Sequence, residues 1–104
     1  MMKKSTLFIV GGSQEQTFMK IGKKQNCNIL FHPGKVRNGG VKNAFRKSVK
    51  NADCVVVLCD ALMHETMYQV KDLCKEYDTK VVFHTNGFGA SGAIAAGLGK
   101  LGAA

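Results

Sequence analysis

The stretch that decides the fold is Cys54-Val55-Val56-Val57-Leu58-Cys59. It is continuously apolar and rich in β-branched residues, which is typical of a parallel strand buried on both faces. Such a strand lies in the middle of a sheet whose two faces are both covered. Residues 54–59 therefore predict a central strand between two layers of helices.

On both sides of this strand, short apolar runs alternate with segments whose apolar residues recur every three or four positions. The runs end in stretches that contain glycine, proline or histidine. Strands are predicted at 7–10, 27–32 and 81–83, and helices at 14–23, 41–52 and 63–78. A fourth helix is expected within the glycine-rich segment 86–104, although each glycine costs up to about 1 kcal/mol of helical propensity.

Strands that alternate with helices form βαβ units with right-handed crossovers. The sequence therefore predicts an α/β fold: one small doubly wound domain over residues 1–104, Rossmann- or flavodoxin-like, with a four-stranded parallel sheet in the order 2-1-3-4. Ligands of such sheets bind beyond the carboxyl ends of the strands.

The composition indicates a folded cytoplasmic protein with acidic partners. Hydrophobic residues make up 45% of the 104 residues and charged residues 21%, which excludes a disordered chain. The apolar run at 7–10 is too short for a signal peptide or a membrane span. The net charge of +8 favours nucleic acid, phosphorylated small molecules or an anionic cofactor, and a solvated basic surface is the alternative.

The cysteines form no C-x-x-C pair, which argues against a zinc ribbon and a thioredoxin-type motif. Three of them, Cys27, Cys54 and Cys74, are expected to be small buried hydrophobic residues. No serine, cysteine or aspartate stands in a recognisable nucleophile or paired-carboxylate motif, so no catalytic residue is assigned and enzymatic activity stays open.

All three histidines stand near predicted strand ends: His32, His64 and His84. In a parallel sheet these ends share one rim, where Cys59 and Asp60 also fall. Imidazole, thiolate and carboxylate groups bind zinc, iron or haem iron. The sequence therefore allows a haem or transition-metal site that uses His32, His64, His84 and Cys59, against the alternative of hydrogen-bonded loop histidines.

Two glycine-rich loops suggest anion binding at the same rim. Residues 87–92 match G-x-G-x-x-G, but the chain ends before the strand and acidic residue that a dinucleotide site needs. Gly87 and Gly89 then either capture an anion or permit a tight helix. The second loop, Gly11-Gly12-Ser13, lacks the P-loop lysine, which argues against a Walker-type nucleotidase.

The loop after the second strand adds positive charge through Lys35 and Arg37. Together these residues predict a module that binds an anionic small molecule or cofactor through Gly11, Gly12, Ser13, His32, Lys35, Arg37, Asp60, Gly87 and Gly89, with His64 and His84 on the same rim. The alternatives are a histidine-ligated metal or haem protein, and nucleic-acid binding through the basic helix that carries Lys42, Arg46, Lys47 and Lys50. The exposed sheet edges also predict self-association.

Four short motifs resemble the bacterial domain of unknown function 2325 family: Ile9-Val10-Gly11-Gly12, Phe31-His32-Pro33-Gly34, Ala52-Asp53-Cys54-Val55-Val56, and residues 60–64. The resemblance covers the first strand through the fourth. It implies that the family's characteristic positions are Gly11, Gly12, His32, Gly34, Asp60 and His64. Pro33 stands where family members commonly carry an acidic residue, so no role that needs that carboxylate carries over. The family implies a fold rather than an activity.

Overall fold

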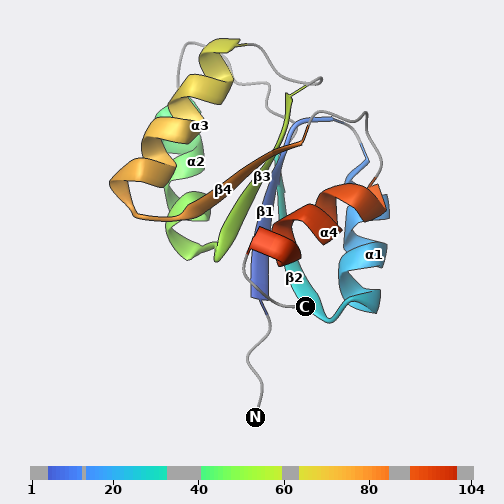
Figure 1. Cartoon of the computed structure of the whole chain (residues 1–104). Helices are drawn as coiled ribbons and strands as arrows, with labels where there is room; N and C mark the ends of the chain where they lie inside the picture. Colours follow the sequence, from blue (N-terminus) through green and yellow to red (C-terminus); the bar gives the residue numbers. More distant parts are fainter. Residues whose placement is uncertain (1–4, 13, 33–40, 60–63, 85–89, 101–104) are drawn as a thin grey trace.

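Four strands and four helices alternate along the chain, as the sequence predicts (Figure 1). The computed structural model describes residues 5–12, 14–32, 41–59, 64–84 and 90–100. The strands are β1 (Ser5–Val10), β2 (Cys27–His32), β3 (Cys54–Leu58) and β4 (Lys80–His84). The helices are α1 (Glu15–Lys24), α2 (Val41–Asn51), α3 (His64–Glu76) and α4 (Ala90–Lys100).

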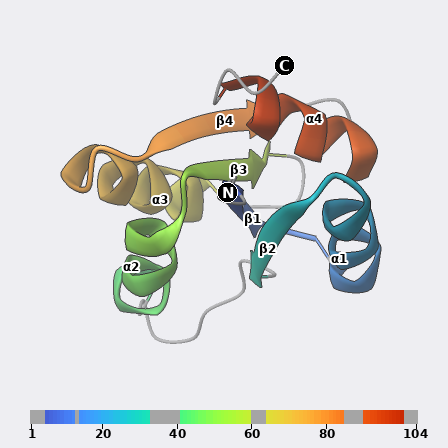
Figure 2. The ribbon, with the colours of Figure 1, turned by 90° about the horizontal axis from the view of Figure 1, so that it is seen from below.

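The sheet has the predicted order β2-β1-β3-β4, and every pairing is parallel. Helices α1 and α4 cover one face and α2 and α3 cover the other, as Figures 1 and 2 show. We name these the α1/α4 face and the α2/α3 face. The prediction of a doubly wound α/β fold is confirmed.

Each face of the sheet carries its own apolar core, because successive side chains of a strand point to opposite faces. β3 is buried at every residue and contributes to both cores. The core of the α1/α4 face contains Leu7, Ile9, Phe18, Cys54, Val56, Leu58, Ala93 and Ile94. The core of the α2/α3 face contains Phe8, Val10, Phe45, Val49, Val55, Val57, Val70, Leu73 and Cys74.

The glycine-rich helix α4 forms because its glycines let it approach the sheet closely. Ala93 and Ile94 are buried, and a Cβ placed on Gly97 would lie 2.8 Å from Val56 Cγ2. Close packing thus compensates for the low helical propensity of this segment. Gly97 lies outside the glycine motif at 87–92, so both interpretations of that motif stay predictions.

The cysteine prediction is also confirmed. Cys27, Cys54 and Cys74 are buried, Cys59 is half-buried, and none of the four forms a disulfide. Burial, with a smaller contribution from Cys54, raises the pKa of the Cys74 thiol to about 12. Cys74 therefore acts as an apolar core residue.

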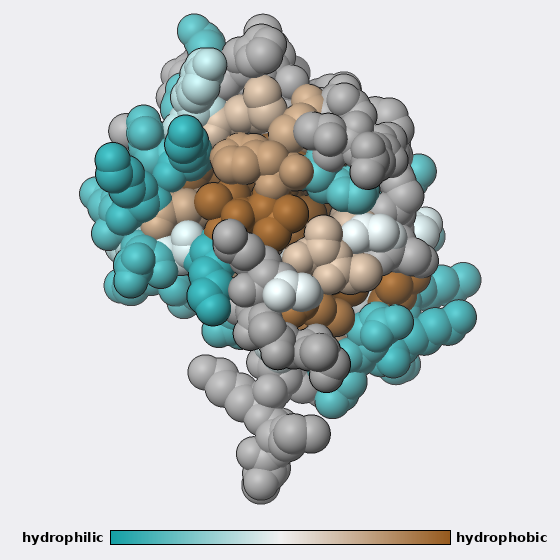
Figure 3. All heavy atoms as spheres, viewed as in Figure 1, coloured by the Kyte–Doolittle hydropathy of each residue, from teal (hydrophilic) through white to brown (hydrophobic). Residues whose placement is uncertain are grey.

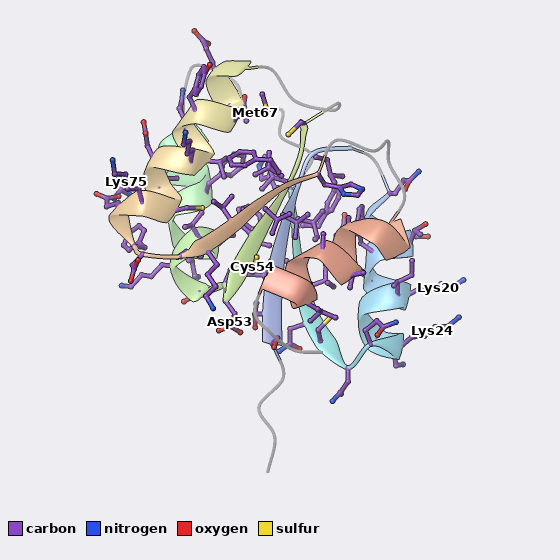
Figure 4. All side chains as sticks on the ribbon, viewed as in Figure 1. Lys20, Lys24, Asp53, Cys54, Met67 and Lys75 are labelled. Atoms are coloured by element: carbon purple, nitrogen blue, oxygen red, sulfur yellow. The ribbon has the colours of Figure 1, made fainter. Side chains whose placement is uncertain are left out.

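The amino end of β3 is fixed to β1 by a pair of hydrogen bonds. Thr6 N donates to Asp53 Oδ2 (2.7 Å), and Asp53 N donates to Thr6 O (2.8 Å). Asp53 and Cys54 lie at this end of the sheet (Figure 4). None of the described helices is both long and apolar enough to cross a bilayer.

Both edges of the sheet are formed by short strands. On β4, Phe83 is 41% exposed and Val81 and Val82 are half-buried. Apolar residues gather in the middle of the face drawn in Figure 3, the region that β4 crosses in Figure 1. Self-association through a sheet edge stays a prediction.

Candidate functional site

The carboxyl ends of β1 and β3 meet at a topological switch point. Val10 pairs with Val57 in the register of these neighbouring strands. The helix that follows β1 packs on the α1/α4 face, whereas the helix that follows β3 packs on the α2/α3 face. The two connections therefore diverge, and doubly wound proteins bind their ligands at such a point.

Two glycines carry the chain out of β1 at this point. Gly11 and Gly12 have φ angles of 110° and 90°, in the left-handed region that favours glycine. Gly11 N donates to His32 O (2.8 Å), which ties the start of the turn to the end of β2. A Cβ on Gly12 would lie 3.7 Å from Leu58 Cδ1, so backbone conformation rather than space requires glycine there.

Helix α1 begins directly after this turn and points its amino end at the rim. Gln14 stands at its N-cap and makes no side-chain capping hydrogen bond. The first intrahelical bond of this turn is from Phe18 N to Gln14 O (3.0 Å). The N–H groups of the first turn and the positive end of the helix dipole are thus directed toward the switch point.

His32 ends β2 beside the glycine turn. Its ring packs edge-on against Phe45 of α2, with ring centroids 4.5 Å apart and planes at 79°. Burial lowers the pKa of His32 below the ordinary histidine value of 6.5. Burial at this position therefore disfavours the charged imidazolium form of His32.

His84 ends β4 at the other edge of the sheet. It pairs in register with Leu58, on the α1/α4 face, and a Cβ on Gly92 of α4 would lie 3.5 Å from its Cε1 atom. His32 pairs with Val10 and lies on the α2/α3 face. Three inter-strand spacings, roughly 14 Å, separate the two strand ends.

The rim prediction is thus correct for His32 and His84, but their side chains are not brought together. Within the described residues, no three His, Cys, Asp or Glu side chains are grouped so that they could hold a metal ion. Cys59 packs at the α2/α3 face, and its Sγ lies 3.8 Å from Val57 O. A site that uses Cys59 with Asp60 and His64 stays a prediction, because Asp60 and the His64 side chain lie outside the described part.

Several other predicted anion-binding residues also lie outside the described ranges: Ser13, Lys35, Arg37, Gly87 and Gly89. Their roles stay predictions. In the sequence, Lys35 and Arg37 follow the carboxyl end of β2, and Gly87 and Gly89 follow that of β4.

The basic helix proposed for nucleic acid is α2, and one of its cations is used within the protein. Arg46 Nη1 forms a salt bridge with Glu76 Oε2 (3.0 Å) and donates to Tyr77 Oη (3.1 Å). Lys47 and Lys50 are exposed, and the Lys42 side chain is outside the described part. Arg46 thus joins α2 to α3, a role that the charge pattern did not reveal.

The sequence analysis missed two neighbours of the rim histidines, Phe45 and Gly92. The sequence does indicate that Phe45 is buried against the sheet, because Phe45 stands on the apolar stripe of a helix. The sequence does not indicate that Gly92 lies beside His84, because this proximity depends on how α4 crosses the sheet.

The lowered pKa of His32 predicts a loss of stability on acidification. The unfolded chain, with a histidine pKa near 6.5, binds the proton more readily than the folded chain does. The free energy of unfolding should therefore fall as the pH drops through about 6.5. In urea unfolding between about pH 7 and about pH 5, the wild type should lose more stability than His32→Gln. Equal losses in the two proteins would show that His32 is not responsible.

Comparisons with known proteins give one consistent result. The family model described as "Uncharacterized protein conserved in bacteria (DUF2325)" matches residues 6–100. A UPF0751 protein of Bacillus cereus (strain AH820) is 41% identical over 100 residues, which is 96% of this chain and 99% of the relative. A UPF0751 protein of Bacillus anthracis (strain A0248) is 40% identical with the same coverage. A more distant one, from Desulfitobacterium hafniense (strain Y51), is 28% identical over 78 residues, 74% of this chain and 76% of the relative.

Proposed function

The chain belongs to the bacterial family DUF2325, and from this premise we propose that it binds an anionic small molecule or cofactor at the carboxyl ends of its strands. A phosphorylated compound is the favoured ligand class. The proposal concerns binding alone.

The observation that carries the proposal is the conformation of Gly11 and Gly12. Two consecutive residues with left-handed φ angles stand at the switch point, directly before a helix amino end. Glycines in such a turn allow a ligand to approach the backbone closely, and the first-turn N–H groups then donate to its oxygens. Anionic oxygens are favoured because the helix dipole is positive at this end.

Charge and the neighbouring histidine support the same ligand class. The net charge of +8 attracts anions over long range. His32 lies beside Gly11 at the same strand ends, so a ligand bound at the glycine turn would lie near its imidazole. Ser13, Lys35, Arg37, Asp60, Gly87 and Gly89 are the further residues proposed to contact it.

Thermal unfolding with inorganic phosphate, pyrophosphate, ATP and NAD tests the proposal. A ligand at about 100 times its dissociation constant stabilises the folded chain by about 2.7 kcal/mol, so at least one compound should raise the melting temperature by several degrees. Gly12→Ala should reduce this ligand-induced shift, because alanine disfavours the left-handed backbone.

The matched control is Gly99→Ala. A Cβ on Gly99 meets no atom of the described residues within 4 Å, and Gly99 lies in α4 rather than at the switch point. Its ligand-induced shift should equal that of the wild type. An unchanged shift in Gly12→Ala, or the absence of stabilisation by every anion, would contradict the proposal.

The same purified protein serves to test the two alternative functions, metal or haem binding and nucleic-acid binding. A Soret band, or metal found by elemental analysis after purification without a metal-affinity column, would favour histidine ligation. Binding to nucleic acid that weakens steeply with salt would favour the basic helix α2.

A further inference from the structure

An open hollow of about 670 Å³ lies at the outer edge of β2, toward the amino end of that strand. Met19 and Lys23 of α1 line one side, and Asn51 of α2 lines the other. Between them lie Ile29 and Leu30, whose side chains belong to opposite faces of the sheet. The hollow therefore wraps around the edge of β2. Figure 2 shows the position of β2 between α1 and α2.

The backbone of β2 presents hydrogen-bonding groups to this hollow. His32 O accepts from Gly11 N, so the backbone groups of His32 are directed toward β1. Because consecutive residues of a strand direct their N–H and C=O groups to opposite sides, those of Ile29 and Phe31 are directed away from β1. β2 is the terminal strand in the sheet order, so no strand of the described residues pairs with this side.

Lysines stand on both sides of the hollow. Lys23 lines it directly, and Lys20 lines a smaller adjoining hollow that is also lined by Glu15. On the other side, the exposed Lys47 stands one helical turn before Asn51, so the two share a face of α2. Figure 4 shows Lys20 projecting from α1. The charge around the edge is thus predominantly positive.

We propose that the edge of β2 binds an extended, acidic segment of another protein, which adds to the sheet as a further strand. Main-chain hydrogen bonds from Ile29 and Phe31 supply affinity, and the hollow receives alternate side chains of the added strand. The exposed Met19 offers an apolar contact there. This surface is separate from the carboxyl-end site and goes beyond the proposed function.

The lysines determine which strand fits. Charged side chains beside an edge strand prevent pairing with edges of like charge. A second copy of this chain would bring Lys20, Lys23 and Lys47 toward their own counterparts, and repulsion opposes that arrangement. A strand with carboxylates on alternate residues directs them to one face, where they meet Lys20 and Lys23 with attraction.

Fluorescence anisotropy with the full chain tests the proposal. The probe is a labelled peptide of about seven residues in which glutamate and valine alternate. Lys23→Glu should weaken binding about tenfold, because attraction becomes repulsion. Lys71→Glu is the matched control: it makes the same change of charge at an exposed site on α3, and should alter the affinity less than about twofold. Circular dichroism checks that both variants are folded.

Two further measurements separate strand addition from unspecific attraction. In amide hydrogen exchange, the peptide should protect the N–H groups of Ile29 and Phe31. A peptide with proline in place of each valine should not bind, because those residues cannot donate backbone hydrogen bonds.

Equal weakening by Lys23→Glu and Lys71→Glu, or unchanged exchange at Ile29 and Phe31, would overturn the proposal. So would a dimer that forms through β2. Displacement of the peptide by oligothymidine, without any protection of Ile29 and Phe31, would assign the lysines to nucleic acid and overturn it as well.

Discussion

Phe45→Ala is expected to lower the free energy of unfolding by about 3–5 kcal/mol. Phe45 is fully buried on the α2/α3 face, where its ring packs edge-on against Phe8 with centroids 5.7 Å apart. It also contacts His32 at the rim. Alanine removes these contacts and leaves a cavity that the rigid sheet cannot fill. Urea unfolding followed by circular dichroism measures the loss.

Phe83→Ala is the matched control for this substitution. The side chain is the same, but Phe83 is 41% exposed at the β4 edge. Its replacement should cost less than half as much, because less apolar surface leaves the interior. Equal losses at the two positions would contradict the assignment of Phe45 to the core that supports the rim.

Gly97→Ala is expected to destabilise the protein by about 1–3 kcal/mol, although alanine is the better helix former. The new Cβ would lie 2.8 Å from Val56 Cγ2 and 3.2 Å from Leu7 Cδ2. Both neighbours are fully buried in the sheet and have no room to move. Helix α4 would have to shift away from the α1/α4 face.

Gly99→Ala should change stability in the opposite direction. Gly99 stands two residues further along the same helix, where a Cβ meets no atom within 4 Å in the part of the chain that the structure describes. The gain in helical propensity is about 0.5–1 kcal/mol. Calorimetry should therefore show a lower melting temperature for Gly97→Ala and a higher one for Gly99→Ala. Shifts of the same sign would contradict the close approach of α4 to the sheet.

The sheet was predictable because its signals are local. The run at 54–59 is apolar without interruption, and only a strand covered on both faces needs such a run. The strand order followed from handed crossovers. The rim positions of His32 and His84 followed in turn from the common direction of the strands.

The arrangement of the site depends on long-range geometry that the sequence does not show locally. His32 and His84 lie on opposite faces because one is in register with Val10 and the other with Leu58. The salt bridge between Arg46 and Glu76 forms only because α2 and α3 lie side by side. These relations depend on register and helix packing, which no single motif encodes.

The backbone turn after β1 is the part of the site that sequence and structure share. The sequence predicts that Gly11 and Gly12 contact the ligand, because they directly follow a strand. Their positive φ angles show that the backbone of this turn favours glycine. The central claim is that an anion contacts the protein there.

The most direct test is an amide NMR titration with the anion that stabilises the chain most. The account predicts the largest chemical-shift changes at the N–H groups of Gly12 and Glu15. Smaller changes are expected at His32 and at Gly11, whose N–H donates to His32 O. Changes centred instead on the opposite end of the sheet, at Asn26, Asp53 and Thr79, would contradict it.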